Sequence, residues 1–221
     1  MTVRVEGIAP DTVVVFHNGI DVAAFSNMTV NWTVKQKLGI PKDNKVIGII
    51  ANFRPMKRHD TFLRAAQGIL AIRNDVDFLL VGHRNAADKS QVLAQELGIA
   101  ERLHFVGSQP NVVPYLSVMD IGVNCSEREG LSNAVMEYMA ARVPCVVSQS
   151  GGNPDLITQG ETGLTFPLGD HQALTTAVLT LLENESLRRK FAQNAKEKVD
   201  RQLTVSFMLS RYHDFYCAMM Q

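Results

Sequence analysis

The chain has 221 residues, a length that fits one domain of ordinary size and allows a sizeable core. Its 22 Lys and Arg balance its 22 Asp and Glu, so no net field favours nucleic acid or an anionic membrane, and any anion site must be local. The three cysteines have no metal-ligand spacing and no apolar run approaches the roughly 20 residues that span a bilayer, so we expect a cytoplasmic protein and leave peripheral contact with the cytosolic face of a membrane open.

The first 28 residues differ from the chain that follows. An apolar, β-branched run at 12–16 predicts a strand, and the sequence His-Asn-Gly-Ile-Asp at 17–21 predicts a turn. One strand followed by a turn is typical of a linker, so we expect this part of residues 1–28 to lead into the main domain.

Strands and helices are predicted to alternate through residues 29–200. Near-continuous apolar strands joined by helical crossovers predict a doubly wound parallel sheet, the Rossmann-like α/β fold, with a ligand beyond the carboxyl ends of the strands. The predicted strands are 45–51, 77–81, 103–106, 120–124 and 143–148, and apolar residues recur at helical spacing in Phe62, Ala65, Ala66 and Ile69 and in Leu174, Ala177, Val178, Leu181 and Leu182.

The end of the chain predicts two consecutive helices, at 188–200 and 204–219, with no strand between them. We treat 201–221 as a separate C-terminal helix. Its side chains include Phe207, Tyr212, Phe215 and Tyr216, which is more aromatic surface than a helix without a partner exposes.

The strongest chemical signal is the segment 129–137, which follows a predicted strand. A helix is predicted to start near Ser132, with Ser132 or Asn133 as its capping residue. Gly130, just before that start, lets the backbone approach a ligand closely. The free N–H groups of the first helical turn then suit a phosphate.

Two acidic residues lie on either side of this predicted helix start. Glu129 is in the preceding loop, and Glu137 is one turn into the helix with its side chain inclined back toward the start. Both can accept hydrogen bonds from hydroxyl groups, so together with the phosphate site they match a nucleoside diphosphate sugar. The alternative is that the two glutamates only stabilise the helix dipole.

A basic loop follows the strand predicted at 45–51. It contains Arg54, which can clamp phosphate oxygens with its planar fork, and Lys57, which supplies a mobile point charge. These two residues are the natural partners of a pyrophosphate. The alternative is a solvated basic loop, and we assign Arg58 to that alternative.

Other signals at strand exits are weaker. The Gly-rich turn at 151–155 offers amides that could contact a transferred sugar, although a plain tight turn explains it equally well. His83 is expected to be a surface residue, because no carboxylate partner is near it in sequence. Cys125 and Cys145 are expected to be small core residues.

From residue 13 to about residue 199 the chain resembles the C-terminal domain of group 1, family-four-type retaining glycosyltransferases of the GT-B fold. Residues 14–21 look like the segment that joins the family's two domains, so residues 1–28 would hold the end of the N-terminal domain and the linker. Glu129 and Glu137 match its paired glutamates, which are separated by seven residues. The turn at 151–155 resembles the family's Gly-Gly-x-x-Glu turn, with Asp155 in place of the glutamate.

The resemblance implies roles for these residues. Glu137 would hold the ribose hydroxyls of the donor. Glu129, together with the amides of Gly130, Leu131 and Ser132, would hold the donor hexose and the diphosphate, which makes Glu129 the catalytic candidate. Such enzymes typically need no metal or other cofactor for the transfer, and they retain the anomeric configuration of the sugar.

The resemblance also shows departures from the family pattern. Lys57 matches the phosphate-binding lysine, but the family's usual arginine five residues earlier is replaced by Asn52, so Arg54 would have to supply the charge in this donor site. Arg142 stands where many members have glycine.

The family builds its active site between two Rossmann-like domains, and the acceptor site lies in the N-terminal one. We therefore expect a donor-binding half that is inactive without an N-terminal GT-B domain. Its expected partners are that domain, a nucleoside diphosphate sugar of the UDP or GDP type and a carbohydrate or lipid acceptor, but no nucleic acid. Two alternatives stay open: a non-catalytic nucleotide-sugar-binding module and a protein related to sugar-nucleotide epimerases.

Overall fold

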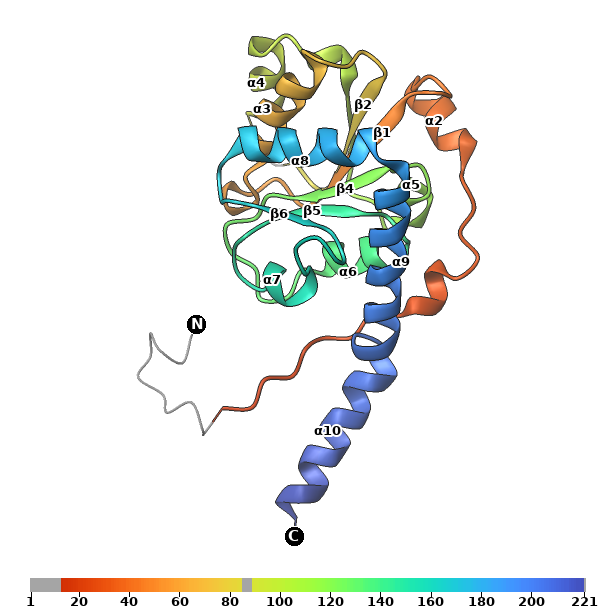
Figure 1. Ribbon diagram of the computed structural model, residues 1–221, viewed down its shortest axis with the longest axis vertical. Coiled ribbons are helices and arrows are strands. Elements are labelled where there is room, and N and C mark those ends of the chain that lie inside the picture. The colour runs from red at the N-terminus through yellow and green to blue at the C-terminus, as the bar shows by residue number, and fades with distance from the viewer. Residues whose placement is uncertain (1–12, 85–88, 221) are drawn as a thin grey trace.

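The computed structural model describes residues 13–84 and 89–220, which fold around a six-stranded sheet (Figure 1). Every pairing between neighbouring strands is parallel, and the order β3-β2-β1-β4-β5-β6 is that of a Rossmann sheet, so the predicted fold is confirmed. The strands are β1 (Lys45–Ile50), β2 (Val76–Val81), β3 (Leu103–Gly107), β4 (Ile121–Asn124), β5 (Cys145–Ser148) and β6 (Leu164–Phe166).

Helices cover both faces of this sheet. Alternate side chains of β2 enter two separate cores: Phe78 and Leu80 pack with α3, α4 and α8, whereas Leu79 and Val81 pack with α2, α6 and the second half of α9. The α-helices are α2 (Trp32–Leu38), α3 (His59–Leu70), α4 (Ser90–Glu96), α5 (Val113–Leu116), α6 (Asn133–Ala140), α7 (Asn153–Leu156), α8 (His171–Glu183), α9 (Glu185–Gln202) and α10 (Val205–Met219), and the 3₁₀ turns are η2 (Val22–Phe25), η3 (Pro55–Lys57) and η4 (Ala100–Arg102).

The strand order creates a switch point between β1 and β4. The chain leaves β1 toward one edge of the sheet, through β2 and β3, and leaves β4 toward the other edge, through β5 and β6. Loops that leave the carboxyl ends of these two strands therefore diverge and leave a crevice between them. The two loops are the basic segment after β1 and the segment after β4 that contains the paired glutamates.

The prediction of a strand at 12–16 is wrong for the residues that the structure describes. Residue 12 lies outside them, and residues 13–16 form no regular structure. This segment runs beside α10, where Phe16 stacks on Tyr212 with ring centroids 4.3 Å apart. A strand needs a neighbouring strand for its backbone hydrogen bonds, and a helix cannot supply it. The short β6, in contrast, was not predicted.

The two consecutive C-terminal helices are confirmed as α9 and α10. Figure 1 shows α10 projecting away from the body formed by the sheet and its helices, with the start of the described chain alongside. Ile20 N–H donates to the carbonyl of Leu203 at 2.8 Å, which fastens the linker at the junction of the two helices. Phe16 also covers Phe215, but Phe207 and Tyr216 stay exposed on α10.

Arg142 lies in the left-handed region of backbone space, with φ 54°. It follows Ala141, the C-cap residue of α6, and helices often have glycine at this position because a residue with a side chain is strained there. The glycine that the resemblance noted above places here would adopt this conformation without strain. The arginine adopts the same backbone conformation at a cost.

Candidate functional site

A cleft of about 420 Å³ opens at the carboxyl edge of the sheet, over the switch point between β1 and β4. Four chain segments meet in it: the ends of β1 and β2 with the loops that follow them, the loop after β3, and the segment from the end of the loop after β4 into α6. It is lined by Ile50, Ala51, Asn52, Arg54, Lys57, Val81, Gly82, Ser108, Gln109, Val112, Glu129, Leu131, Ser132, Asn133, Ala134 and Glu137.

This cleft brings together all but one of the residues that the sequence predicted for a donor site. Gly130 does not line it, although its neighbours Glu129 and Leu131 do. Ser108, Gln109 and Val112 were not predicted. The only sequence signal for them was a glycine at the exit of β3, because the loop has no charge pattern that marks a ligand site.

Glu129 and Lys57 form an ion pair across the cleft. Lys57 Nζ lies 2.5 Å from Glu129 Oε1, and the Ser126 hydroxyl donates to the same oxygen at 2.8 Å. No donor among residues 13–84 and 89–220 reaches the other oxygen, Oε2. One carboxylate oxygen is thus fixed by the protein, and the second is available to a ligand.

Glu137 lies half-buried in the wall of the cleft. Burial raises the pKa of its carboxyl group to about 7, because the charged form loses its hydration. Within the described ranges no cation or hydrogen-bond donor compensates for this loss. A carboxylate that is partly desolvated and has no protein partner is well placed to accept hydrogen bonds from hydroxyl groups of a ligand.

The start of α6 also faces the cleft, with Ser132 in the N-cap position. The predicted capping bond is absent: the Ser132 hydroxyl accepts from Asn124 Nδ2 at 3.0 Å and caps none of the first-turn N–H groups. Asn133 is the first residue of the helix, so the prediction of it as an alternative cap is wrong. The first turn contains no acidic side chain. Its positive end is therefore open to an anion.

The basic loop after β1 contributes two kinds of contact. Arg54 is exposed at the cleft, and its guanidinium pairs with no acid in the part of the chain that the structure describes. Asn52 Oδ1 accepts from the backbone N–H of His83 at 2.9 Å and so ties this loop to the one after β2. Arg58, assigned to the surface, pairs with Asp60 at 3.1 Å and does not line the cleft.

The Gly-rich turn at 151–155 does not line the cleft, but it packs against the backbone of the Glu129 loop, which does. Gly152 N–H donates to the carbonyl of Glu129 at 3.1 Å. A Cβ atom on Gly152 would lie 1.8 Å from the carbonyl oxygen of Gly130, and one on Gly151 would lie 2.5 Å from that of Glu129. Only glycine allows this approach, so the two glycines fix the position of the Glu129 loop.

The remaining predictions concern residues outside the cleft. Cys125 and Cys145 are buried free cysteines in the core, as expected. His83 is exposed. No helix in residues 13–84 or 89–220 is long and apolar enough to cross a bilayer.

Comparisons with known proteins agree with this fold. The family model "Glycosyl transferases group 1" matches residues 30–198. N-acetyl-alpha-D-glucosaminyl L-malate synthase from Bacillus anthracis is 32% identical over 183 residues, which are 83% of this chain and 48% of that protein. The chain spans about half the length of the curated relatives it matches.

Solved structures are similar over nearly the whole chain. A glycosyltransferase from Rickettsia africae aligns with a TM-score of 0.90 at 18% identity, over 97% of this chain and 59% of that one. Anabaena Alr3699/HepE in complex with UDP and glucose aligns with a TM-score of 0.88 at 20% identity, over 98% and 60%. These likenesses show the fold, and the match of the family model decides membership. The resemblance noted from the sequence is confirmed: the chain belongs to the group 1 glycosyl transferases.

Proposed function

We propose that this chain is the donor-binding half of an enzyme that transfers a hexose from a nucleoside diphosphate sugar, of the UDP or GDP type, to a carbohydrate or lipid acceptor. The observation that carries the proposal is the cleft over the switch point. Two cations, the uncapped start of α6 and two carboxylates that can accept hydrogen bonds converge there. The chain spans only about half the length of its curated relatives, so the activity proposed is that of a protein that also contains an N-terminal half.

In this proposal the donor lies across the cleft with its diphosphate at the centre. Lys57, Arg54 and the first-turn N–H groups of α6 bind the phosphate oxygens. Glu137 accepts from the ribose hydroxyls, and Glu129 Oε2 accepts from hydroxyl groups of the hexose. The base then lies toward the loop after β3, beside Gln109.

In the transfer step, this half of the enzyme mainly stabilises charge. The bond between the anomeric carbon and the β-phosphate oxygen breaks, and its electron pair stays on the phosphate. A hydroxyl oxygen of the acceptor bonds to the same face of that carbon and gives its proton to the departing phosphate, so the configuration is retained. Lys57 and the α6 amides stabilise the charge that develops on the phosphate. Glu129, fixed by Lys57 and Ser126, orients the hexose.

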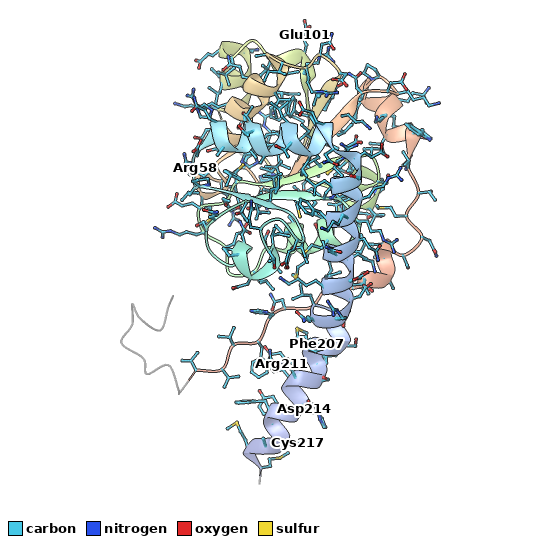
Figure 2. All side chains as sticks on the ribbon, viewed as in Figure 1. Arg58, Glu101, Phe207, Arg211, Asp214 and Cys217 are labelled. Atoms are coloured by element: carbon cyan, nitrogen blue, oxygen red, sulfur yellow. The ribbon has the colours of Figure 1, made fainter. Side chains whose placement is uncertain are left out.

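An N-terminal half is expected to supply the acceptor site and to cover α10. Figure 2 shows Phe207, Arg211, Asp214 and Cys217 along α10, outside the body that holds the sheet. Apolar side chains on this helix and on the linker are exposed, among them Val15, Phe207 and Tyr216. Such a surface is typical of an interface.

All three cysteines of the chain are free. Because disulfides form and persist in oxidising compartments, we infer a cytoplasmic location.

Calorimetric titration of this chain with UDP, GDP and ADP, and with their glucose or mannose conjugates, tests the proposal. We expect one nucleotide class to bind at the cleft, and no nucleotide release beyond slow hydrolysis when acceptors are added. Joined to an N-terminal half, the same chain should transfer the sugar with retention. Binding without transfer by the joined protein would leave a non-catalytic binding module. No binding of any nucleotide would refute the donor site.

A further inference from the structure

Asn124 lies beneath the cleft and connects its parts without lining it. It is the last residue of β4 and is 3% exposed. Its Nδ2 lies 3.0 Å from Ser132 Oγ and 3.5 Å from Glu129 Oε1. Its Oδ1 accepts from the backbone N–H of Ser126 at 3.0 Å and from Asn153 Nδ2 at 3.2 Å. One buried carboxamide thus contacts four positions around the cleft.

The orientation of this carboxamide follows from its partners. The Ser126 backbone N–H can only donate, so the group facing it must be Oδ1, and the ionised Glu129 can only accept, so Nδ2 faces Glu129 and Ser132. Asn153 is oriented in the same way, since its Nδ2 lies 3.1 Å from the carbonyl of Ser148. Asn153 is fully buried, and within the described residues its Oδ1 has no hydrogen-bond partner, whereas its Nδ2 fixes Asn124.

The bond from Asn124 determines where the Ser132 hydroxyl points. A serine in the N-cap position normally accepts from an N–H group of the first turn, which satisfies that group and removes it from ligand binding. Here the hydroxyl oxygen accepts from Asn124 Nδ2, which directs it toward β4, and no capping bond forms. The first turn of α6 keeps its N–H groups open toward the cleft.

We propose that Asn124 is a positioning residue that holds the Ser132 hydroxyl away from the first turn of α6 and so keeps that turn available to a diphosphate. The inference rests on the proposed function, because it needs the cleft to bind a diphosphate. Asn124 has a second effect on the same site. Its Oδ1 fixes the backbone of Ser126, whose hydroxyl in turn donates to Glu129 Oε1.

A first test compares Asn124→Ala with the unchanged chain by hydrogen exchange of backbone amides without ligand. Freed from Asn124, the Ser132 hydroxyl should cap α6, so the Ala134 and Val135 amides should exchange several times more slowly although the domain as a whole is less stable. Adding Ser132→Ala should abolish this protection. If Asn124 were only a structural contact, its loss would speed amide exchange at the start of α6. That result would overturn the proposal. Asn124→Ser gives the same comparison if the alanine variant does not fold.

A second test measures affinity for UDP and GDP by calorimetry and for uridine and guanosine by NMR titration. Since a capping bond must be displaced by the ligand, Asn124→Ala should weaken binding of the preferred diphosphate about fivefold, with nucleoside affinity unchanged. The loss should shrink when Ser132→Ala is already present. Equal losses for nucleoside and diphosphate, or no loss at all, would overturn the proposal. If the unchanged chain binds neither UDP nor GDP, the proposed function itself fails.

Asn44→Ala is the matched control for both tests. Asn44 Nδ2 donates to Asp77 at 2.7 Å, next to the amino end of β1 and therefore at the opposite edge of the sheet from the cleft. Like Asn124→Ala, Asn44→Ala removes a side-chain amide and a hydrogen bond to a carboxylate. We expect lower stability with no change in diphosphate affinity and no protection at the start of α6. If Asn44→Ala weakened diphosphate binding as much as Asn124→Ala, the effect at Asn124 would be one of general stability.

Discussion

Lys57 Nζ and Glu129 Oε1 lie 2.5 Å apart, although 72 positions separate these residues in the sequence. The first residue belongs to the loop after β1 and the second to the loop after β4, and they meet because those strands are neighbours at the switch point. The pair is mostly buried, so each partner also neutralises a charge that would be costly alone. A bound diphosphate would share this lysine with Glu129, because the ammonium group has three N–H donors.

Replacing Lys57 by alanine should weaken diphosphate binding. A hydrogen bond to a charged group contributes roughly 1.5 to 3 kcal/mol, so affinity for the preferred nucleoside diphosphate should fall about ten- to a hundredfold. Calorimetry with UDP and GDP measures the change. Lys45→Ala is the control, because Lys45 forms a comparable ion pair with Asp120 at 3.0 Å at the amino end of β1. Equal effects of the two variants would argue against a phosphate contact at Lys57.

Glu137 should make nucleoside binding depend on pH. Its carboxyl group has a pKa of about 7 in the free protein, and hydroxyl groups bind best to the ionised form. Affinity for uridine or guanosine should therefore fall as pH drops below 7, by up to about tenfold between pH 8 and pH 6. These nucleosides have no phosphate that titrates in this range. Glu137→Gln should bind more weakly at pH 8 and show no such dependence; a pH profile that survives this substitution would assign the proton to another group.

The same carboxyl group should also make stability depend on pH. Its folded pKa of about 7 lies above the ordinary value of 4.5, so the folded state binds the proton more tightly, and stability falls as pH rises from about 4.5 through 7. Glu137→Gln avoids this loss. Allowing for partial exposure, we expect the variant to be about 1 to 2 kcal/mol more stable at pH 8. Urea unfolding measures the difference, which should vanish at pH 4.

Replacing Arg142 by glycine should stabilise the domain. Arg142 has φ 54°, a conformation that costs roughly 1 to 2 kcal/mol for a residue with a side chain. Glycine removes this strain from the folded state, but it also gives the unfolded chain more conformational freedom, which offsets about half of the gain in stability. The net effect should be about 0.5 to 1 kcal/mol in urea unfolding. Arg142→Ala keeps the Cβ atom and should give no gain. Arg189→Gly, inside α9, should destabilise by about 1 kcal/mol.

The sequence alone was sufficient for the fold and for two of the four chain segments that line the cleft, the loop after β1 and the segment that leads into α6. Short apolar runs and helical periodicity are local properties, and their alternation permits few topologies other than a doubly wound sheet. Residues directly after parallel strands must lie at one edge of that sheet, so Lys57 and Glu129 could be assigned to a common site. The resemblance to group 1 glycosyltransferases rested on the same spacing between Glu129 and Glu137.

Only the tertiary structure decided how these residues are held. Residues 13–16 have the composition of a strand but lie beside α10, so their neighbour is a helix and not a strand. Ser132 has the sequence position of a cap but is drawn away by Asn124, and that partner is eight residues distant. The raised pKa of Glu137 depends on what buries it. In each case the outcome depends on which distant group approaches the residue, and local sequence preferences carry no information about that approach.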